Sequence, residues 1–198
     1  MFIKHVGAIA IVVALSGCAF TPQAPIVIKP AIAAQHTNVG AGQSLQVVVS
    51  DERVSKTLGT RGVRGVGSEL TVAGDLAQTL DTSITEGLKN QGFVPTDRTI
   101  KDGRVLHVEI RDLEYNMIMG FWAGTMRTQC SLKAVCAVGN VRPFEKMYHG
   151  EHEESVQVVQ TADANTEYVN DAVSKAVNQL LDDPDLAQCL ASPVLAAQ

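Results

Sequence analysis

Three stretches of alternating apolar and polar residues follow one another along the chain, and they constrain its fold most. In the first, Leu106, Val108 and Ile110 alternate with polar residues after an Asp102-Gly103 turn signal. The second spans about residues 125–138 and the third about residues 144–158. Consecutive strands joined by short turns pair antiparallel. We therefore expect a three-stranded antiparallel meander.

Each strand of this meander has one apolar and one polar face. Side chains on the polar face are expected to meet solvent or a partner; they are Arg127, Gln129, Lys133, His107 and Glu109. In the first strand the apolar phase moves from Ile110 to Leu113, which predicts a β-bulge near Arg111-Asp112.

Amphipathic helices flank the meander. Leu76, Leu80, Ile84 and Leu88 recur every four residues, which predicts a helix over about 75–91 that ends before Gly92. A second apolar stripe predicts a helix over about 165–182, and Pro184 separates it from a short helix near 185–190. With a strand at 45–50 and another at 93–94, we expect a two-layer α+β fold. It would have a mainly antiparallel sheet of about four to five strands with two helices packed on one face.

The first residues have the layout of a secretory signal. Lys4 precedes a short apolar run, and the small residues Ser16 and Gly17 come before Cys18. This ending resembles the lipobox of bacterial lipoproteins, in which the cysteine is lipidated and becomes residue one. We therefore expect a signal peptide at 1–17, a lipidated tether at 18–43, a single α+β lipoprotein domain at 44–191 and a flexible tail at 192–198. The run Ile26-Val27-Ile28 within the tether could dock on the domain as an extended edge.

The net charge of the chain narrows the classes of partner. The formal net charge is -5 with Lys4 and -6 without it, since 15 basic residues then face 21 acidic ones. A mildly acidic protein is a poor general binder of nucleic acid or anionic membrane, so a membrane anchor would come from the lipid.

Besides Cys18, the chain has Cys130, Cys136 and Cys189. Either one of the two strand cysteines, Cys130 and Cys136, forms a disulfide with Cys189, or both are buried free thiols. The sequence leaves both readings open.

Several local stretches together resemble the YajG-type bacterial lipoproteins over nearly the whole chain. They are the lipobox, the segment from Ile26 to Pro30, the strand end from Val47 to Arg53, the helix exit from Leu88 to Phe93 and the run from Asn170 to Val173. The resemblance implies a Gram-negative-type envelope, and no enzymatic activity follows from membership of that family. In that envelope the residue after the lipidated cysteine sorts the protein, and Ala19 rather than Asp favours the outer membrane.

Two surfaces are candidates for partner binding. The stretch from Met117 through Met119, Phe121 and Trp122 to Ala123 is apolar where a polar hairpin tip is expected, so it either packs on the core or meets a partner or lipid. A Gly-rich loop carries Arg61 and Arg64 and reads as a mobile loop or as a contact for carboxylate or phosphate.

The sequence contains few residue patterns that indicate catalysis or metal binding. Asp51 and Arg53 share strand parity and predict a structural ion pair. No Gly-x-Ser-x-Gly elbow is present in the sequence. His149 and His152 fall on opposite faces of a strand, so no metal site is expected. No catalytic residue and no cofactor is expected, apart from covalent diacylglycerol and N-acyl lipid on Cys18.

The sequence therefore predicts a non-catalytic outer-membrane lipoprotein that faces the periplasm. It would act as an interaction or accessory subunit of an envelope complex for transport, secretion or assembly, with no nucleic acid as partner. The alternative is a periplasmic lipoprotein that binds a small ligand, a lipid or a glycan fragment, between sheet and helices. A hydrolase lacks a recognisable constellation of residues.

Overall fold

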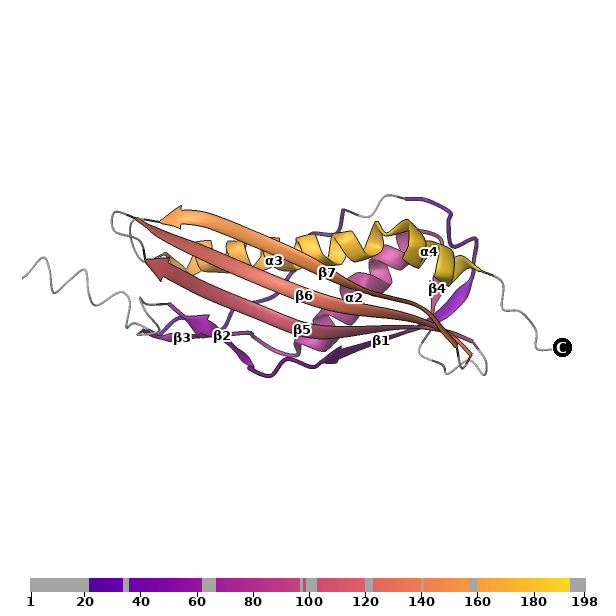
Figure 1. Ribbon diagram of the computed structural model, residues 1–198, viewed down its shortest axis with the longest axis horizontal. Coiled ribbons are helices and arrows are strands. Elements are labelled where there is room, and N and C mark those ends of the chain that lie inside the picture. The colour runs from indigo at the N-terminus through magenta and orange to yellow at the C-terminus, as the bar shows by residue number, and fades with distance from the viewer. Residues whose placement is uncertain are drawn as a thin grey trace, which may run out of the picture.

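The domain is a single mixed sheet with helices on one face. The computed structural model describes residues 22–33, 36–61, 67–96, 98, 103–119, 123–139, 141–156 and 160–192. The strands are β1 (Ser44–Asp51), β2 (Thr57–Thr60), β3 (Glu69–Thr71), β4 (Val94–Pro95), β5 (Arg104–Met119), β6 (Gly124–Val138) and β7 (Val141–Val156). The described helices are α2 (Leu76–Asn90), α3 (Ala162–Leu181) and α4 (Pro184–Ala191). Figure 1 shows the two longer helices behind the sheet.

The predicted meander is present. β5 pairs antiparallel with β6 along its whole length, and β6 pairs antiparallel with β7. The expected bulge is confirmed by a register shift between Ile110 and Asp112. Alternate residues of β6, including Cys130, Leu132 and Ala134, are buried against the helices.

The prediction of a mainly antiparallel sheet with four to five strands is wrong. The sheet has seven strands, and β1 pairs parallel with both β5 and β4. Parallel neighbours need a crossover connection, and α2 supplies it between β1 and β4. β2 continues along the same edge of β5, where Gly59 lies opposite Tyr115.

Helix ends follow local sequence signals. Asp75 caps α2 by accepting a hydrogen bond from the Gln78 backbone N–H, and Gly92 follows the helix with a φ of 83°. Thr161 caps α3, and Asp183 caps α4 directly before Pro184. The predicted helices at 75–91, 165–182 and 185–190 therefore match α2, α3 and α4 within a few residues.

One core fills the space between the sheet and the helices. Leu80 and Ile84 of α2 and Val173 and Val177 of α3 are each 0% exposed, as are Leu106 and Leu132 of the sheet. A disulfide between Cys136 and Cys189 joins β6 to α4, and Cys130 is a buried free thiol. The bond expected between a strand cysteine and Cys189 is therefore formed by Cys136. Cys130 is instead a buried free thiol, as the other reading expected.

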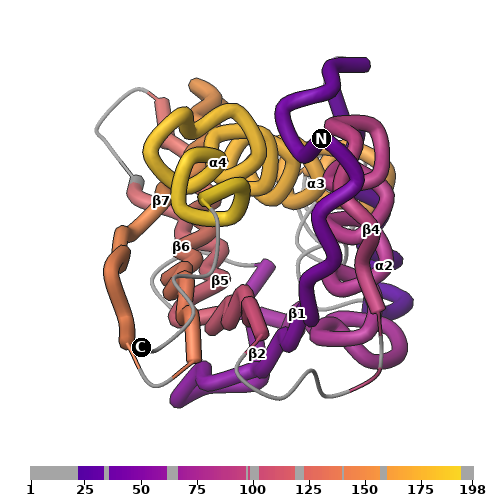
Figure 2. The backbone as a smooth tube through the Cα atoms, turned by 90° about the vertical axis from the view of Figure 1, so that its right-hand side faces the viewer, coloured from indigo at the N-terminus to yellow at the C-terminus, as the bar shows by residue number. Residues whose placement is uncertain are grey.

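Residues 22–33 lie along α3, and we call this segment the strap. Ile26 and Ile28 are buried in the core, and Ile26 forms a parallel bridge with Val72. Farther along, the Asn178 side chain donates to the Ala31 carbonyl and accepts from the Ala33 N–H. Figure 2 shows the first described residues beside the helices. The docking expected for Ile26-Val27-Ile28 is therefore present.

Candidate functional site

The outer edge of β7 has no partner strand in the part of the chain that the structure describes. Among the described strands β7 pairs only with β6, so one row of its backbone groups points away from the sheet. The His149 N–H points to that side, where the Gln179 side chain accepts it at 3.4 Å. The Glu151 carbonyl also points outward and accepts from Lys175 Nζ at 2.9 Å. Because strand residues alternate, the backbone groups of Met147 face the same way.

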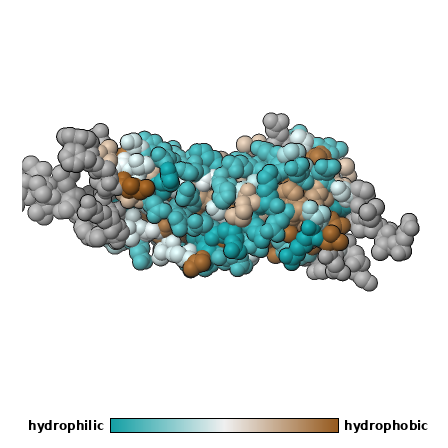
Figure 3. Space-filling model, in the orientation of Figure 1, coloured by the Kyte–Doolittle hydropathy of each residue, from teal (hydrophilic) through white to brown (hydrophobic). Residues whose placement is uncertain are grey.

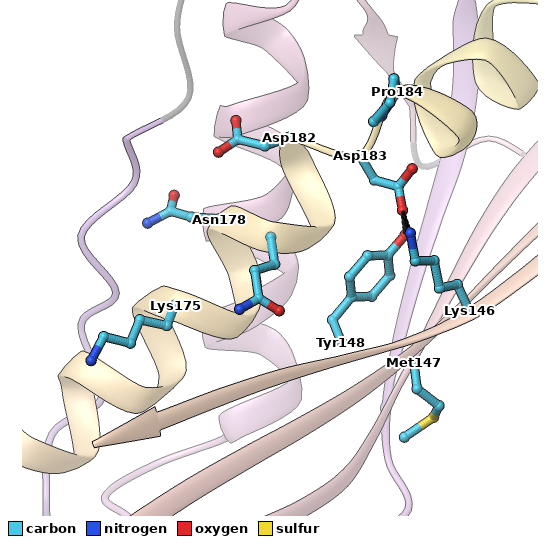
Figure 4. Close-up of a pocket in the computed structure, with 9 residues that line it drawn as sticks. Lys146, Met147, Tyr148, Lys175, Asn178, Asp182, Asp183 and Pro184 are labelled. Carbon is cyan, nitrogen blue, oxygen red and sulfur yellow. Dashed lines mark hydrogen bonds and ion pairs between the residues drawn. The ribbon is translucent and has the colours of Figure 1, made fainter. Parts of the chain in front are cut away.

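A groove of about 560 Å³ lies beside this edge, and we call it the edge groove. Its lining comes from β7, the last two turns of α3 and the start of α4 (Figure 4). The lining residues are Lys146, Met147, Tyr148, Lys175, Asn178, Gln179, Asp182, Asp183 and Pro184. Positive, negative, amide and apolar groups therefore all border the groove.

Asp183 fixes the end of the groove where α3 passes into α4. Its Oδ2 accepts from Lys146 Nζ at 2.7 Å and from the Tyr148 hydroxyl at 2.8 Å, as Figure 4 shows. Its Oδ1 accepts from the backbone N–H groups of Asp185 and Leu186. Burial raises the pKa of this carboxyl, but the hydrogen bonds from Lys146, Tyr148 and the backbone outweigh burial and lower it. Asp183 is thus a charged structural cap.

The position of α3 beside β7 depends on Gly150. A Cβ atom at this position would overlap the Ala172 carbonyl oxygen and lie 2.6 Å from the Ala176 backbone nitrogen. Only glycine allows the helix this close to the strand. The close approach brings Gln179 and Lys175 within hydrogen-bond reach of the edge, and the groove lies along the same side of β7.

The outer face of the sheet carries charged pairs. Arg127 bonds Glu151 and Glu153 on β7, and Lys133 pairs with Glu145 at 2.9 Å. In the orientation of Figure 3, the surface over the middle of the strands is mostly hydrophilic. This face, expected from sequence to be polar, is therefore solvated rather than apolar.

The ion pair predicted between Asp51 and Arg53 is formed at the break between β1 and β2. Arg53 Nε and Nη2 each donate to the Asp51 carboxylate at 2.9 Å, and Lys56 Nζ lies 3.1 Å from it. The Arg53 side chain is only 4% exposed. Burial raises the pKa of Asp51, but the bonds from Arg53 and Lys56 outweigh it and lower the pKa to about 2. The pair stabilises this turn.

The predicted partner surfaces are only partly described. Arg61 Nε and Nη2 donate to the Gln160 carbonyl, so its guanidinium joins the β2–β3 hairpin to the start of α3. Met117 packs partly buried against the core, whereas Ile118 is 57% exposed. Pairing of β2 with β5 at Gly59 and Tyr115 brings these residues to one end of the domain. Cys18, Arg64, Phe121, Trp122 and the side chain of Met119 lie outside the described residues.

The two histidines of β7 do not converge. His149 Nδ1 lies 3.0 Å from the Ser131 hydroxyl on the outer face, whereas His152 Nδ1 bonds Asp171 at 2.7 Å and its ring stacks on Tyr168. Within the described part of the chain, no group of three metal-binding side chains comes together. No described helix is long and apolar enough to cross a membrane.

Sequence reasoning missed the edge groove. Met147, Lys175 and Gln179 read in sequence as ordinary polar-face positions, because nothing local says which strand ends the sheet. Asp183 had a usable signal, since an acidic residue directly before Pro184 is typical of a helix N-cap.

Solved structures of other bacterial proteins resemble this chain to differing degrees. The chain is similar in fold to a Xanthomonas campestris protein, with a TM-score of 0.51 at 16% identity over 81% of this chain and 92% of that one. A minor lipoprotein from Acinetobacter baumannii gives a TM-score of 0.46 at 14% identity, covering 76% and 94%. Rare lipoprotein B from Shewanella oneidensis gives 0.38 at 14% identity, covering 74% and 92%. No curated protein sequence matches this chain.

A family model provides the assignment. It is described as uncharacterized lipoprotein and matches residues 30–191, which include every described strand and helix. Because the match extends over most of the 198 residues, the chain belongs to this family of uncharacterized lipoproteins.

Proposed function

We propose that this lipoprotein is a non-catalytic accessory subunit of an envelope complex and binds an extended segment of a partner protein in the edge groove. Lipid on Cys18 would anchor it to the outer membrane at the periplasmic face, as the lipobox and Ala19 suggest. The narrower YajG-type assignment belongs to the same proposal. The lipoprotein family supports the anchoring, and the edge groove supports the binding.

The open edge of β7 is the observation that carries the binding proposal. An extended peptide can add to an exposed edge strand, where backbone hydrogen bonds give affinity and alternate side chains enter flanking pockets. At Met147 the outward backbone groups border a groove whose opposite wall is α3. Next to it, Gln179 and Lys175 already bond the edge at residues 149 and 151. Among the described residues, the part of this edge whose outward backbone groups have no bonded side chain therefore lies toward the beginning of β7.

The charged groups around the groove suit binding better than catalysis. Asp183 is held by Lys146, Tyr148 and two backbone N–H groups, and its side chain is 2% exposed. A carboxylate held in this way is satisfied and inaccessible, which is unlike a general base that must reach a substrate. Lys146 pairs with Asp183 and Lys175 with Asp171, and both lysine side chains are half-exposed, so they can also donate hydrogen bonds to acidic groups of a partner.

The small-ligand alternative has less support. It needs a chamber between sheet and helices, yet Leu80, Ile84 and Val173 are 0% exposed in that layer. The edge groove is instead a surface feature with a mixed lining.

The proposal is tested by Met147→Pro, with Met147→Ala as the matched control. Proline removes the outward N–H and leaves the β6 ladder intact, because this N–H points away from β6. The lipidated full-length chain would be purified from crosslinked cells, and associated envelope proteins would be quantified by mass spectrometry. We expect a dominant partner to be retained with Met147→Ala and lost with Met147→Pro. Equal recovery with both variants would contradict binding at this edge.

A further inference from the structure

We propose that one end of the domain rests on a phospholipid bilayer. It is the end at which α3 begins, β5 ends and β6 begins. We call this the near end, and the opposite end, at the β6–β7 turn, the far end. The inference rests on the lipidation of Cys18 in the proposed function. It adds an orientation, which neither the lipid nor the edge groove specifies.

The first argument is the length of chain between the lipid and the domain. Pro22, the first described residue, follows Cys18 by only four positions in the sequence. Four residue steps span at most about 14 Å when the chain is fully extended. Pro22 must therefore lie within about 14 Å of the lipidated cysteine, whatever path the intervening residues take.

The second argument is where the strap begins. The Gln23 side chain donates to the Ala162 carbonyl at 3.4 Å and accepts from Asn165 Nδ2 at 2.9 Å. Ala162 is the first residue of α3, and Asn165 lies within its first turn. The point of attachment is thus fixed at the near end of the domain.

The strap cannot slide away from this position without losing many contacts. Ile26 and Ile28 are 1% and 6% exposed. Asn170 accepts from the Lys29 N–H at 2.5 Å and donates to the Val27 carbonyl at 3.0 Å. The Ser174 hydroxyl accepts from the Ala31 N–H at 2.9 Å. The strap therefore keeps the lipidated residue close to the near end and does not act as a free tether.

Three further parts of the domain lie at the near end: the end of β5, the end of β7 and the β2–β3 hairpin (Figure 1). Ile118 is exposed there, opposite Thr125 at the start of β6. At the far end, Val141 is 64% exposed and pairs with Val138. Thirteen residue steps along β6, from Thr125 to Val138, separate the two positions, or roughly 44 Å at 3.4 Å per residue.

An orientation flat on the membrane is disfavoured by the charges on the outer sheet face. Arg127 with Glu151 and Glu153, and Lys133 with Glu145, would have to leave water. Removing charged groups from water is costly even when they are paired. A domain held by a short link at one end and charged along its face should project from the bilayer.

The test measures which end meets lipid. Ile118→Cys and Val141→Cys would each be spin-labelled in the lipidated full-length chain and bound to vesicles of phosphatidylethanolamine and phosphatidylglycerol that contain a nickel-chelating lipid. The native cysteines do not compete, because Cys136 and Cys189 are bonded, Cys130 is buried and Cys18 carries the lipid. The chain without an added cysteine is the labelling control.

We expect nickel to enhance relaxation of the Ile118→Cys label several-fold more than that of the Val141→Cys label. A flexible insertion of sixteen residues between Thr21 and Pro22 should reduce this difference. Equal relaxation at the two labels, or no effect of the insertion, would overturn the orientation. Mass spectrometry of the peptide that begins at Cys18 separates this failure from failure of the anchor, because an unlipidated Cys18 would contradict the proposed function itself.

Discussion

The hydroxyl of Tyr115 donates a hydrogen bond to Asn165 Oδ1 at 2.9 Å, and the two residues are 1% and 0% exposed. Asn165 in turn donates to Gln23, so one buried amide connects the sheet, α3 and the strap. Burial raises the pKa of Tyr115 to about 12, so its hydroxyl stays protonated and remains a donor. This chain of bonds fixes the strap where the lipid-bearing segment enters the domain.

Tyr115→Phe tests that connection. The change leaves Asn165 Oδ1 without its donor in a buried site, which typically costs about 1–3 kcal/mol. We expect a loss of this size in urea unfolding. Tyr168→Phe is the control, because its hydroxyl makes a longer bond of 3.4 Å in a half-buried position. Equal small losses in the two variants would show that the Tyr115 bond adds little.

The Asp51–Arg53 pair should make stability depend on acid. The folded pKa of Asp51 is lowered to about 2 from 3.8, so the unfolded state takes up a proton first as the pH falls. The contribution of this group is therefore complete above about pH 4 and is lost as the pH falls toward 2. Urea unfolding between pH 2 and 6 should show a smaller pH dependence for Asp51→Asn than for the wild type.

The same variant should also be less stable at neutral pH. It leaves the buried Arg53 guanidinium with weaker partners, at a cost of about 1–3 kcal/mol. Glu109→Gln removes a pair whose two side chains are 28% and 49% exposed, so it should cost under about 1 kcal/mol. If both variants lost the same free energy, the Asp51 pair would be no more than a surface interaction.

Reduction of the Cys136–Cys189 disulfide should weaken the domain. The bond closes a sequence separation of 53 residues, for which chain entropy gives about 4 kcal/mol. We expect dithiothreitol to lower the urea midpoint of the wild type and to leave Cys189→Ala unchanged. Cys130→Ala should remain sensitive to the reductant, because Cys130 is not bonded. A wild type that is insensitive to reduction would contradict this role of the bond.

Gly150→Ala should force α3 away from β7. The added methyl overlaps the Ala172 carbonyl, and overpacking of this kind typically costs about 1–3 kcal/mol. Glu154→Ala, at an exposed position of the same strand, should change stability by no more than about 0.5 kcal/mol. Thermal unfolding of the two variants makes the comparison, and equal melting temperatures would show that the helix adjusts freely.

Local patterns in the sequence were sufficient for much of the fold. Alternation located β5, β6 and β7, the change of phase at Ile110 marked the bulge, and Gly92 marked the end of α2. Pairing between distant segments could not be obtained in this way. β1 lies parallel to β5 because the chain crosses over through α2, and no short-range pattern states that partner.

The candidate site was less accessible to sequence reasoning for the same reason. Gln23 meets Asn165, and Lys29 meets Asn170, across more than 140 positions, so neither asparagine reads as a binding residue in sequence. Asp51 and Arg53 are two positions apart, and their pairing followed directly from strand parity. The edge groove depends on β7 being the last strand of the sheet, which only the assembled topology reveals.

Photo-crosslinking in living cells examines the edge groove without purification. Benzoylphenylalanine would be placed at Met147, which borders the groove at the β7 edge, and, as a control, at the fully exposed Val54 between β1 and β2. We predict that the lipidated protein crosslinks from position 147 to one envelope protein and that position 54 does not yield this product. The same product from both positions, or none from position 147 in cells that make the protein at its normal level, would contradict partner binding at the β7 edge.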